Sequence, residues 1–72
     1  MDQTQFERLH ELMSRMIGHE YANHPAHDIS ALFQLNNLLF AHEYSQSCGG
    51  CRQRVYNQLK DWYLNNKHTY GY

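Results

Sequence analysis

Two cysteines, Cys48 and Cys51, are the residues whose type and spacing most directly suggest chemistry in this chain. Thiolates at C-x2-C spacing can bind one tetrahedral zinc ion, because the short turn between them brings the sulfur atoms together. His42 shortly precedes the pair and is a third candidate ligand. His10 is a fourth if the start of the chain lies at the same end of the fold. One prediction is therefore a structural zinc site at Cys48, Cys51, His42 and His10.

The same spacing supports two other interpretations. A C-x-x-C pair at a helix N-terminus has a stabilised thiolate and cycles between dithiol and disulfide, which would make the protein a thiol oxidoreductase. That motif usually follows a strand, and no segment of this chain is typical of a strand. Alternatively, both cysteines are small apolar residues that close one end of the core. The spacing does not choose among these three.

Cations and aromatic rings alternate in the C-terminal stretch, residues 51–72. This combination is typical of surfaces that bind phosphates and stack bases, and also of protein interfaces. Four basic side chains would give only a small salt-dependent affinity, so a protein partner is favoured over a nucleic acid. The predicted interaction surface consists of Arg52, Arg54, Tyr56, Lys60, Tyr63, Lys67, Tyr70 and Tyr72.

Charge is divided along the chain, although the net charge is only −1 with neutral histidines. Residues 1–50 hold six acidic and two basic side chains, whereas residues 51–72 hold four basic and one acidic. An acidic body with a basic, aromatic end favours head-to-tail self-association or contact with an anionic partner. We therefore expect a homo-oligomer or a complex with a protein partner.

Length and composition exclude several classes. A chain of 72 residues forms one small domain, and a core of that size supplies roughly 3–5 kcal/mol, so a metal or a partner subunit often supports it. No apolar run approaches the roughly 18 residues of a membrane span, and no signal-peptide pattern is present. Paired carboxylates, a catalytic serine set and a glycine-rich phosphate loop are also absent from the sequence. We expect a cytoplasmic protein that is not an enzyme and has no membrane partner.

Apolar periodicity predicts an all-α fold with a first helix over about residues 4–17. Thr4 and Glu7 have the spacing of a capping box at its start. Phe6 begins an apolar stripe at helical spacing, and Gly18 is a natural stop in the left-handed conformation.

Two further helices follow in the sequence. Asp28 is a suitable N-cap for a helix over about 28–43, which is apolar almost all round and is therefore expected to be central and covered by its neighbours or by another subunit. A third helix is predicted over about 48–66, with a flexible tail at 67–72. Matched lengths and short connections favour an up-down-up three-helix bundle.

The segment Cys48-Gly49-Gly50-Cys51-Arg52 opens the third predicted helix and resembles a C-x-x-C-R motif of short, uncharacterised bacteriophage-encoded proteins. The resemblance implies a small accessory or virion-associated protein, found in the host cytoplasm or the virion. The predicted function is therefore a non-enzymatic protein–protein interaction or assembly module. A thiol redox protein and a weak nucleic-acid binder are the alternatives.

Overall fold

The computed structural model describes residues 1–19, 23–41 and 50–72. These ranges contain no β-strand, which confirms the predicted all-α class. No helix within them is long and apolar enough to cross a lipid bilayer. The helical elements, in chain order, are α1 (Gln3–Met16), α2 (Ala26–Phe40), α3 (Cys51–Asn66) and the short 3-10 helix η1 (Lys67–Tyr70).

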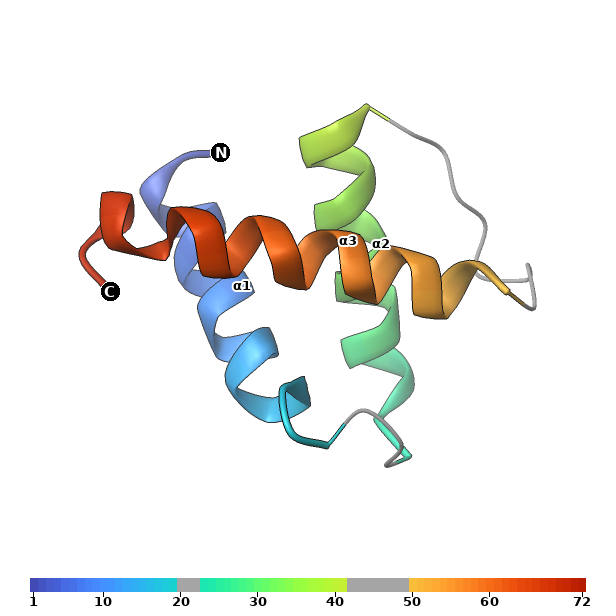
Figure 1. The fold of residues 1–72 in the computed structure, drawn as a ribbon. Helices are drawn as coiled ribbons and strands as arrows, with labels where there is room; N and C mark the ends of the chain where they lie inside the picture. Colours follow the sequence, from blue (N-terminus) through green and yellow to red (C-terminus); the bar gives the residue numbers. More distant parts are fainter. Residues whose placement is uncertain (20–22, 42–49) are drawn as a thin grey trace.

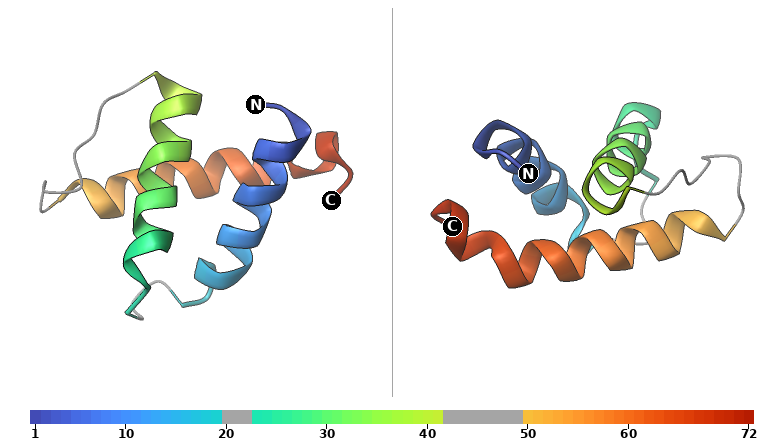
Figure 2. Two further views of the ribbon diagram at one scale, coloured as in Figure 1. Left: turned by 180° about the vertical axis from the view of Figure 1, so that it is seen from behind. Right: turned by 90° about the horizontal axis from the view of Figure 1, so that it is seen from above.

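The helices are arranged in two layers. α1 and α2 form one layer, and α3 lies across one face of that pair (Figures 1 and 2). The up-down-up arrangement is not confirmed, because α3 crosses the first two helices steeply instead of running alongside them. A crossing helix contacts the apolar stripes of both other helices at once, which suits a chain with only one helix available for the second layer.

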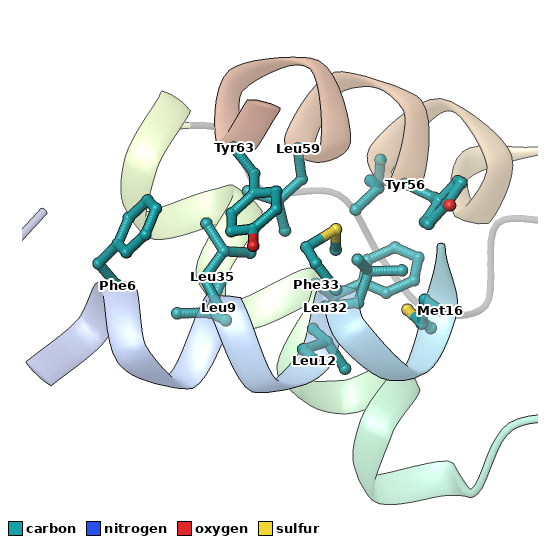
Figure 3. Close-up of a cluster of buried hydrophobic side chains, with 12 residues drawn as sticks. Phe6, Leu9, Leu12, Met16, Leu32, Phe33, Leu35, Tyr56, Leu59 and Tyr63 are labelled. Atoms are coloured by element: carbon teal, nitrogen blue, oxygen red, sulfur yellow. The ribbon is translucent and has the colours of Figure 1, made fainter. Parts of the chain in front are cut away.

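The core fills the space between the two layers (Figure 3). Each helix contributes one apolar stripe, and the stripe on α1 follows the predicted i, i+3, i+4, i+7 spacing. Burial of these stripes is the main stabilising contribution to the fold. The buried apolar side chains are Phe6, Leu9, Leu12, Met13 and Met16 from α1, Leu32, Phe33 and Leu35 from α2, and Val55, Tyr56, Leu59 and Tyr63 from α3.

α2 contacts both other helices, as expected for a central helix, but its apolar surface is only partly covered. Leu38 in its last turn is 58% exposed. The helix ends at Phe40, followed by Ala41 in the left-handed conformation with φ of 55°. Residues 42–49 lie outside the described part of the chain, and with them lie the predicted end of the second helix and the predicted start of the third.

The start of α1 is capped by a capping box of Asp2 and Gln5, two residues earlier than the predicted box of Thr4 and Glu7. The Gln5 N–H donates to Asp2 Oδ1 at 2.8 Å, and the Asp2 N–H donates to Gln5 Oε1 at 3.0 Å. Aspartate caps a helix as well as threonine does, and glutamine supplies the same acceptor as glutamate. The predicted stop at Gly18 is confirmed by its φ of +88°.

α2 begins two residues before the predicted cap. Pro25 occupies the cap position, and its carbonyl oxygen accepts hydrogen bonds from the N–H groups of Asp28 and Ile29 at 3.0 and 3.2 Å. Asp28 therefore lies inside the first turn. Its carboxylate is free of any capping role and turns toward α1.

Residues 67–72 differ from the expected flexible tail, because they include η1 and pack against α1. The Tyr70 hydroxyl donates to the Met1 carbonyl oxygen at 2.7 Å, and the Gln3 side-chain amide donates to the Tyr70 carbonyl oxygen at 3.2 Å. The Tyr70 ring also stacks on Phe6, with centroids 4.2 Å apart and planes 6° apart. These contacts bring the two chain termini together (Figure 1).

Candidate functional site

Of the four predicted zinc ligands, the structure describes only Cys51 and His10, and it does not bring these two together. Cys51, the first residue of α3, is disulfide-bonded. His10 is hydrogen-bonded through Nδ1 to the Tyr63 hydroxyl at 2.6 Å, and Tyr63 lies about 18 Å along α3 from Cys51 at the usual helical rise. His10 therefore does not complete a site at Cys51. His42 and Cys48 lie outside the described residues.

Residues 1–19, 23–41 and 50–72 contain no group of three or more His, Cys, Asp or Glu side chains that could hold a metal ion.

The tyrosine side chains of the predicted interaction surface mostly contact other residues of the same molecule. Tyr56 and Tyr63 are buried in the core, and Tyr70 stacks on Phe6. Tyr72 keeps substantial exposure but stacks on the His10 ring, with centroids 4.0 Å apart. Burial in the core raises the pKa of Tyr63 above its ordinary value of 10.0, and Tyr72 adds to the shift. Tyr56, Tyr63 and Tyr70 therefore contribute to the packing of the fold, whereas part of Tyr72 faces solvent.

The cations of that surface do not form one patch. Arg52 and Arg54 are exposed near the start of α3, two residues apart and thus on different sides of the helix. Lys60 lies over the Tyr56 ring, 5.3 Å from its centroid, and Lys67 is partly buried in η1. This distribution offers no continuous cationic track of the kind that follows a nucleic-acid backbone.

The feature that sequence reasoning missed is a groove of about 440 Å³ between α1 and α2. Its lining comes from these two helices alone, without a residue from α3. The floor is apolar, with Leu12 and Leu35 buried and Ala31 partly buried. The rim is polar and consists of Arg8, Glu11, Arg15, His27, Asp28, Ser30 and Gln34.

An ion pair at one end of the groove holds its two helices together. Arg15 donates from Nε to Asp28 Oδ2 at 3.2 Å and from a terminal nitrogen to Oδ1 at 2.9 Å. The Asp28 side chain is 4% exposed, whereas that of Arg15 is 52% exposed. The hydrogen bond from Arg15 lowers the pKa of the Asp28 carboxyl below its ordinary 3.8, although burial acts in the opposite direction. The signal in the sequence was a basic residue in the last turn of one helix and an acidic residue in the first turn of the next.

Arg8 lies two helical turns before Arg15 on the same rim. It makes no hydrogen bond or ion pair with any residue that the structure describes. Its guanidinium is therefore available to an external carboxylate, whereas that of Arg15 is committed to Asp28.

The rim also carries serine, histidine and aspartate, but they are not arranged for nucleophilic catalysis. Both oxygens of the Asp28 carboxylate are bound by Arg15, and His27 Nε2 lies 3.4 Å from Oδ1 with its side chain 82% exposed. A catalytic carboxylate must be free to orient the histidine, and the histidine must be shielded enough to hold one geometry. His27 and Asp28 therefore do not have the geometry of a catalytic histidine and its orienting carboxylate.

One further exposed feature lies on α3. Leu64 is 45% exposed, and the exposed Asp61 precedes it by one helical turn on the same outer face. Both point away from the stripe of Val55 and Leu59 that α3 buries against the first layer.

No family model, curated protein or solved structure matches this chain. The resemblance of the C-x-x-C-R segment to bacteriophage proteins stays a prediction.

Proposed function

We propose that this protein is a non-enzymatic protein–protein interaction module used in assembly, and that the groove between α1 and α2 is its binding surface. The residue composition of the groove is the observation that supports this proposal. An apolar floor at Leu12, Ala31 and Leu35 lies within a rim that has both charge signs. Protein interfaces commonly have this anatomy, with an apolar centre that is desolvated and a polar rim that sets orientation.

The incomplete cover of α2 supports the same proposal. Leu38, in the last turn of α2, is more than half exposed and follows the groove residues Ala31 and Leu35 at helical spacing. A contiguous apolar surface rimmed by polar groups is typical of an interaction site. A small core also gains stability when a partner covers such a surface.

A photo-crosslinking amino acid placed at Gln34 tests the proposal in cells that express the protein. Gln34 lines the groove, whereas the exposed Glu7 on α1 does not, so Glu7 is the matched control position. We expect a discrete protein adduct from position 34 that is weak from position 7 and is lost when Ala31→Lys blocks the groove. Equal adducts from both positions, or none from position 34, would contradict the proposal.

A thiol redox protein is the second candidate, and one observation favours it. Cys51 is disulfide-bonded and occupies the first position of α3, where Gly50 provides no side-chain cap. A helix N-terminus stabilises a thiolate and so favours exchange. Turnover of a disulfide substrate with a dithiol, lost in Cys51→Ser, would support this candidate. No turnover above the uncatalysed rate would remove it.

Zinc binding is a related proposal that requires reducing conditions, because the Cys51 sulfur is used in its disulfide. Protein purified with a reductant should then contain about one zinc per chain. A zinc content below about a tenth of an equivalent would argue against a structural site.

A further inference from the structure

We propose that the groove receives α3 of a second copy of this chain, with Leu64 inserted into the groove and Asp61 paired with Arg8. This inference rests on the assignment of the groove as the binding surface. It adds the identity of the partner and the direction of assembly.

The inserting surface is the outer face of α3. Leu64 is 45% exposed and Asp61 is exposed one turn before it, so both side chains project from one face. An exposed leucine beside a carboxylate is an apolar anchor with a charge that sets its orientation. This face does not contact the core of its own molecule, which packs on Val55 and Leu59.

The receiving surface has matching properties. The volume of about 440 Å³ falls within the roughly 300–1,000 Å³ of typical ligand-sized sites. Leu12, Ala31 and Leu35 provide an apolar floor for a leucine side chain. The burial of a leucine between copies would remove apolar surface of both partners from water.

Charge complementarity selects the orientation. Arg8 stands on the rim without an ion-pair partner among the described residues, and a guanidinium binds a carboxylate in a specific planar geometry. Asp61 is the only acidic residue of the otherwise basic stretch 51–72, whereas the stretch 1–50 has an excess of acidic residues. The wider charge distribution therefore draws the C-terminal stretch of one copy toward the body of the next.

The two surfaces belong to different elements, the groove to α1 and α2 and the inserting face to α3. The groove has no lining residue from α3, and the exposed Asp61 and Leu64 do not belong to the face that α3 buries. A contact between two different surfaces is heterologous, so it leaves one of each free on every dimer. Assembly should continue into head-to-tail chains or a closed ring instead of stopping at a two-fold dimer.

Sedimentation velocity and light scattering over a range of concentrations test this proposal. We expect the wild-type mass to rise with concentration beyond that of a dimer and Leu64→Lys to remain a monomer. Thr69→Lys is the control, because it adds the same charge at an exposed position of η1 that belongs to neither proposed surface. It should associate as the wild type does. A wild type that stays monomeric at high concentration, or an equal loss in Thr69→Lys, would overturn the proposal.

A mixing experiment tests the direction of assembly. Ala31→Lys blocks the groove and keeps the α3 face, whereas Leu64→Lys keeps the groove and removes the α3 anchor. Each should be monomeric alone, and the mixture should form a 1:1 dimer that does not grow, because one intact surface of each kind remains. Absence of the mixed dimer in two variants with wild-type circular dichroism would overturn the head-to-tail contact.

Charge reversal at exposed positions gives a second test, which does not depend on whether Ala31→Lys folds. Arg8→Glu and Asp61→Arg should each weaken self-association by about tenfold, and the double variant should recover most of that loss. Additive losses in the double variant would exclude the direct pair. If the Gln34 adduct contains a different protein and the wild type is monomeric, this inference fails while the proposed function stands.

Discussion

The side chain of Arg15 donates two hydrogen bonds, of 3.2 and 2.9 Å, to the buried carboxylate of Asp28. This contact joins the last turn of α1 to the first turn of α2, across the loop between them. Because both residues also line the groove, the same ion pair that fixes the two helices shapes one end of the candidate binding surface.

Removal of the Arg15 side chain should destabilise the fold. Arg15→Ala leaves the buried Asp28 carboxylate without its donor, and we expect a loss of about 1–2 kcal/mol in the free energy of unfolding. Arg8→Ala is the control, since it removes the same side chain from the same rim where no partner exists, and it should change stability by less than about 0.5 kcal/mol. Denaturant unfolding by circular dichroism measures both. An equal change in the free energy of unfolding for Arg15→Ala and Arg8→Ala would show that the contact between Arg15 and Asp28 does not stabilise the fold.

Acidification should selectively remove the contribution of Asp28. The hydrogen bond from Arg15 holds the folded-state pKa of Asp28 below the ordinary 3.8, so the stabilisation is present above 3.8 and is lost as the pH falls through the folded-state pKa. The stability difference between the wild type and Asp28→Asn should therefore be largest near neutral pH and should shrink below pH 3.8. Urea titrations of both proteins at a series of pH values measure it. A difference that is independent of pH would contradict the assignment.

Two substitutions at Tyr70 separate its hydrogen bond from its ring contact. Tyr70→Phe removes the hydroxyl that donates to Met1 but keeps the stack on Phe6, so a loss of about 1 kcal/mol is expected. Tyr70→Ala also removes the stack and uncovers Phe6, and it should cost about 1–2 kcal/mol more. Trp62 fluorescence should change in Tyr70→Ala, because the Trp62 ring lies 6.3 Å from the Tyr70 ring. Wild-type stability in Tyr70→Ala would show that the C-terminal segment is not held in place.

Asn36 is the one position where we expect a substitution to raise stability. Asn36 is 0% exposed, and its Oδ1 accepts no hydrogen bond from any residue that the structure describes. Replacement by leucine, whose side chain has the same branching and number of heavy atoms, removes that unsatisfied acceptor and should add about 1 kcal/mol to the free energy of unfolding. Thermal unfolding of Asn36→Leu beside Gln34→Leu, which changes an exposed residue of the same helix, measures the effect. A loss of stability would mean that the amide has a partner, such as a water molecule.

Apolar spacing was sufficient to predict the helices of this chain. The stripe on α1 and the stop at Gly18 are confirmed, and α1 and α3 begin or end within a few residues of the predicted bounds. These features depend on neighbours three or four positions away, which a single stretch of sequence contains. The caps were less predictable, because Asp2 with Gln5 and Thr4 with Glu7 satisfy the same local rule, and only one box can form.

The candidate site depended on contacts that local pattern does not describe. Arg15 and Asp28 are separated by a loop whose path decides whether they meet, and His10 meets Tyr63 only because α3 crosses α1. The basic and aromatic pattern of the C-terminal stretch predicted a surface, yet Tyr56 and Tyr63 are buried. An aromatic residue has the same local signature whether it covers its own core or a partner.

The amino-acid sequence by itself determined three helices, their apolar faces and the uneven distribution of charge. Only the tertiary structure decided that α3 lies across the other two helices, that Tyr70 closes onto Met1 and Phe6, and that a groove stays open between α1 and α2. The physical reason is the difference in sequence range between the interactions that form a helix and those that pack helices together. Helix formation is governed by hydrogen bonds and side chains within one or two turns, whereas a crossing or a groove depends on how whole apolar stripes pack after the chain has folded back on itself.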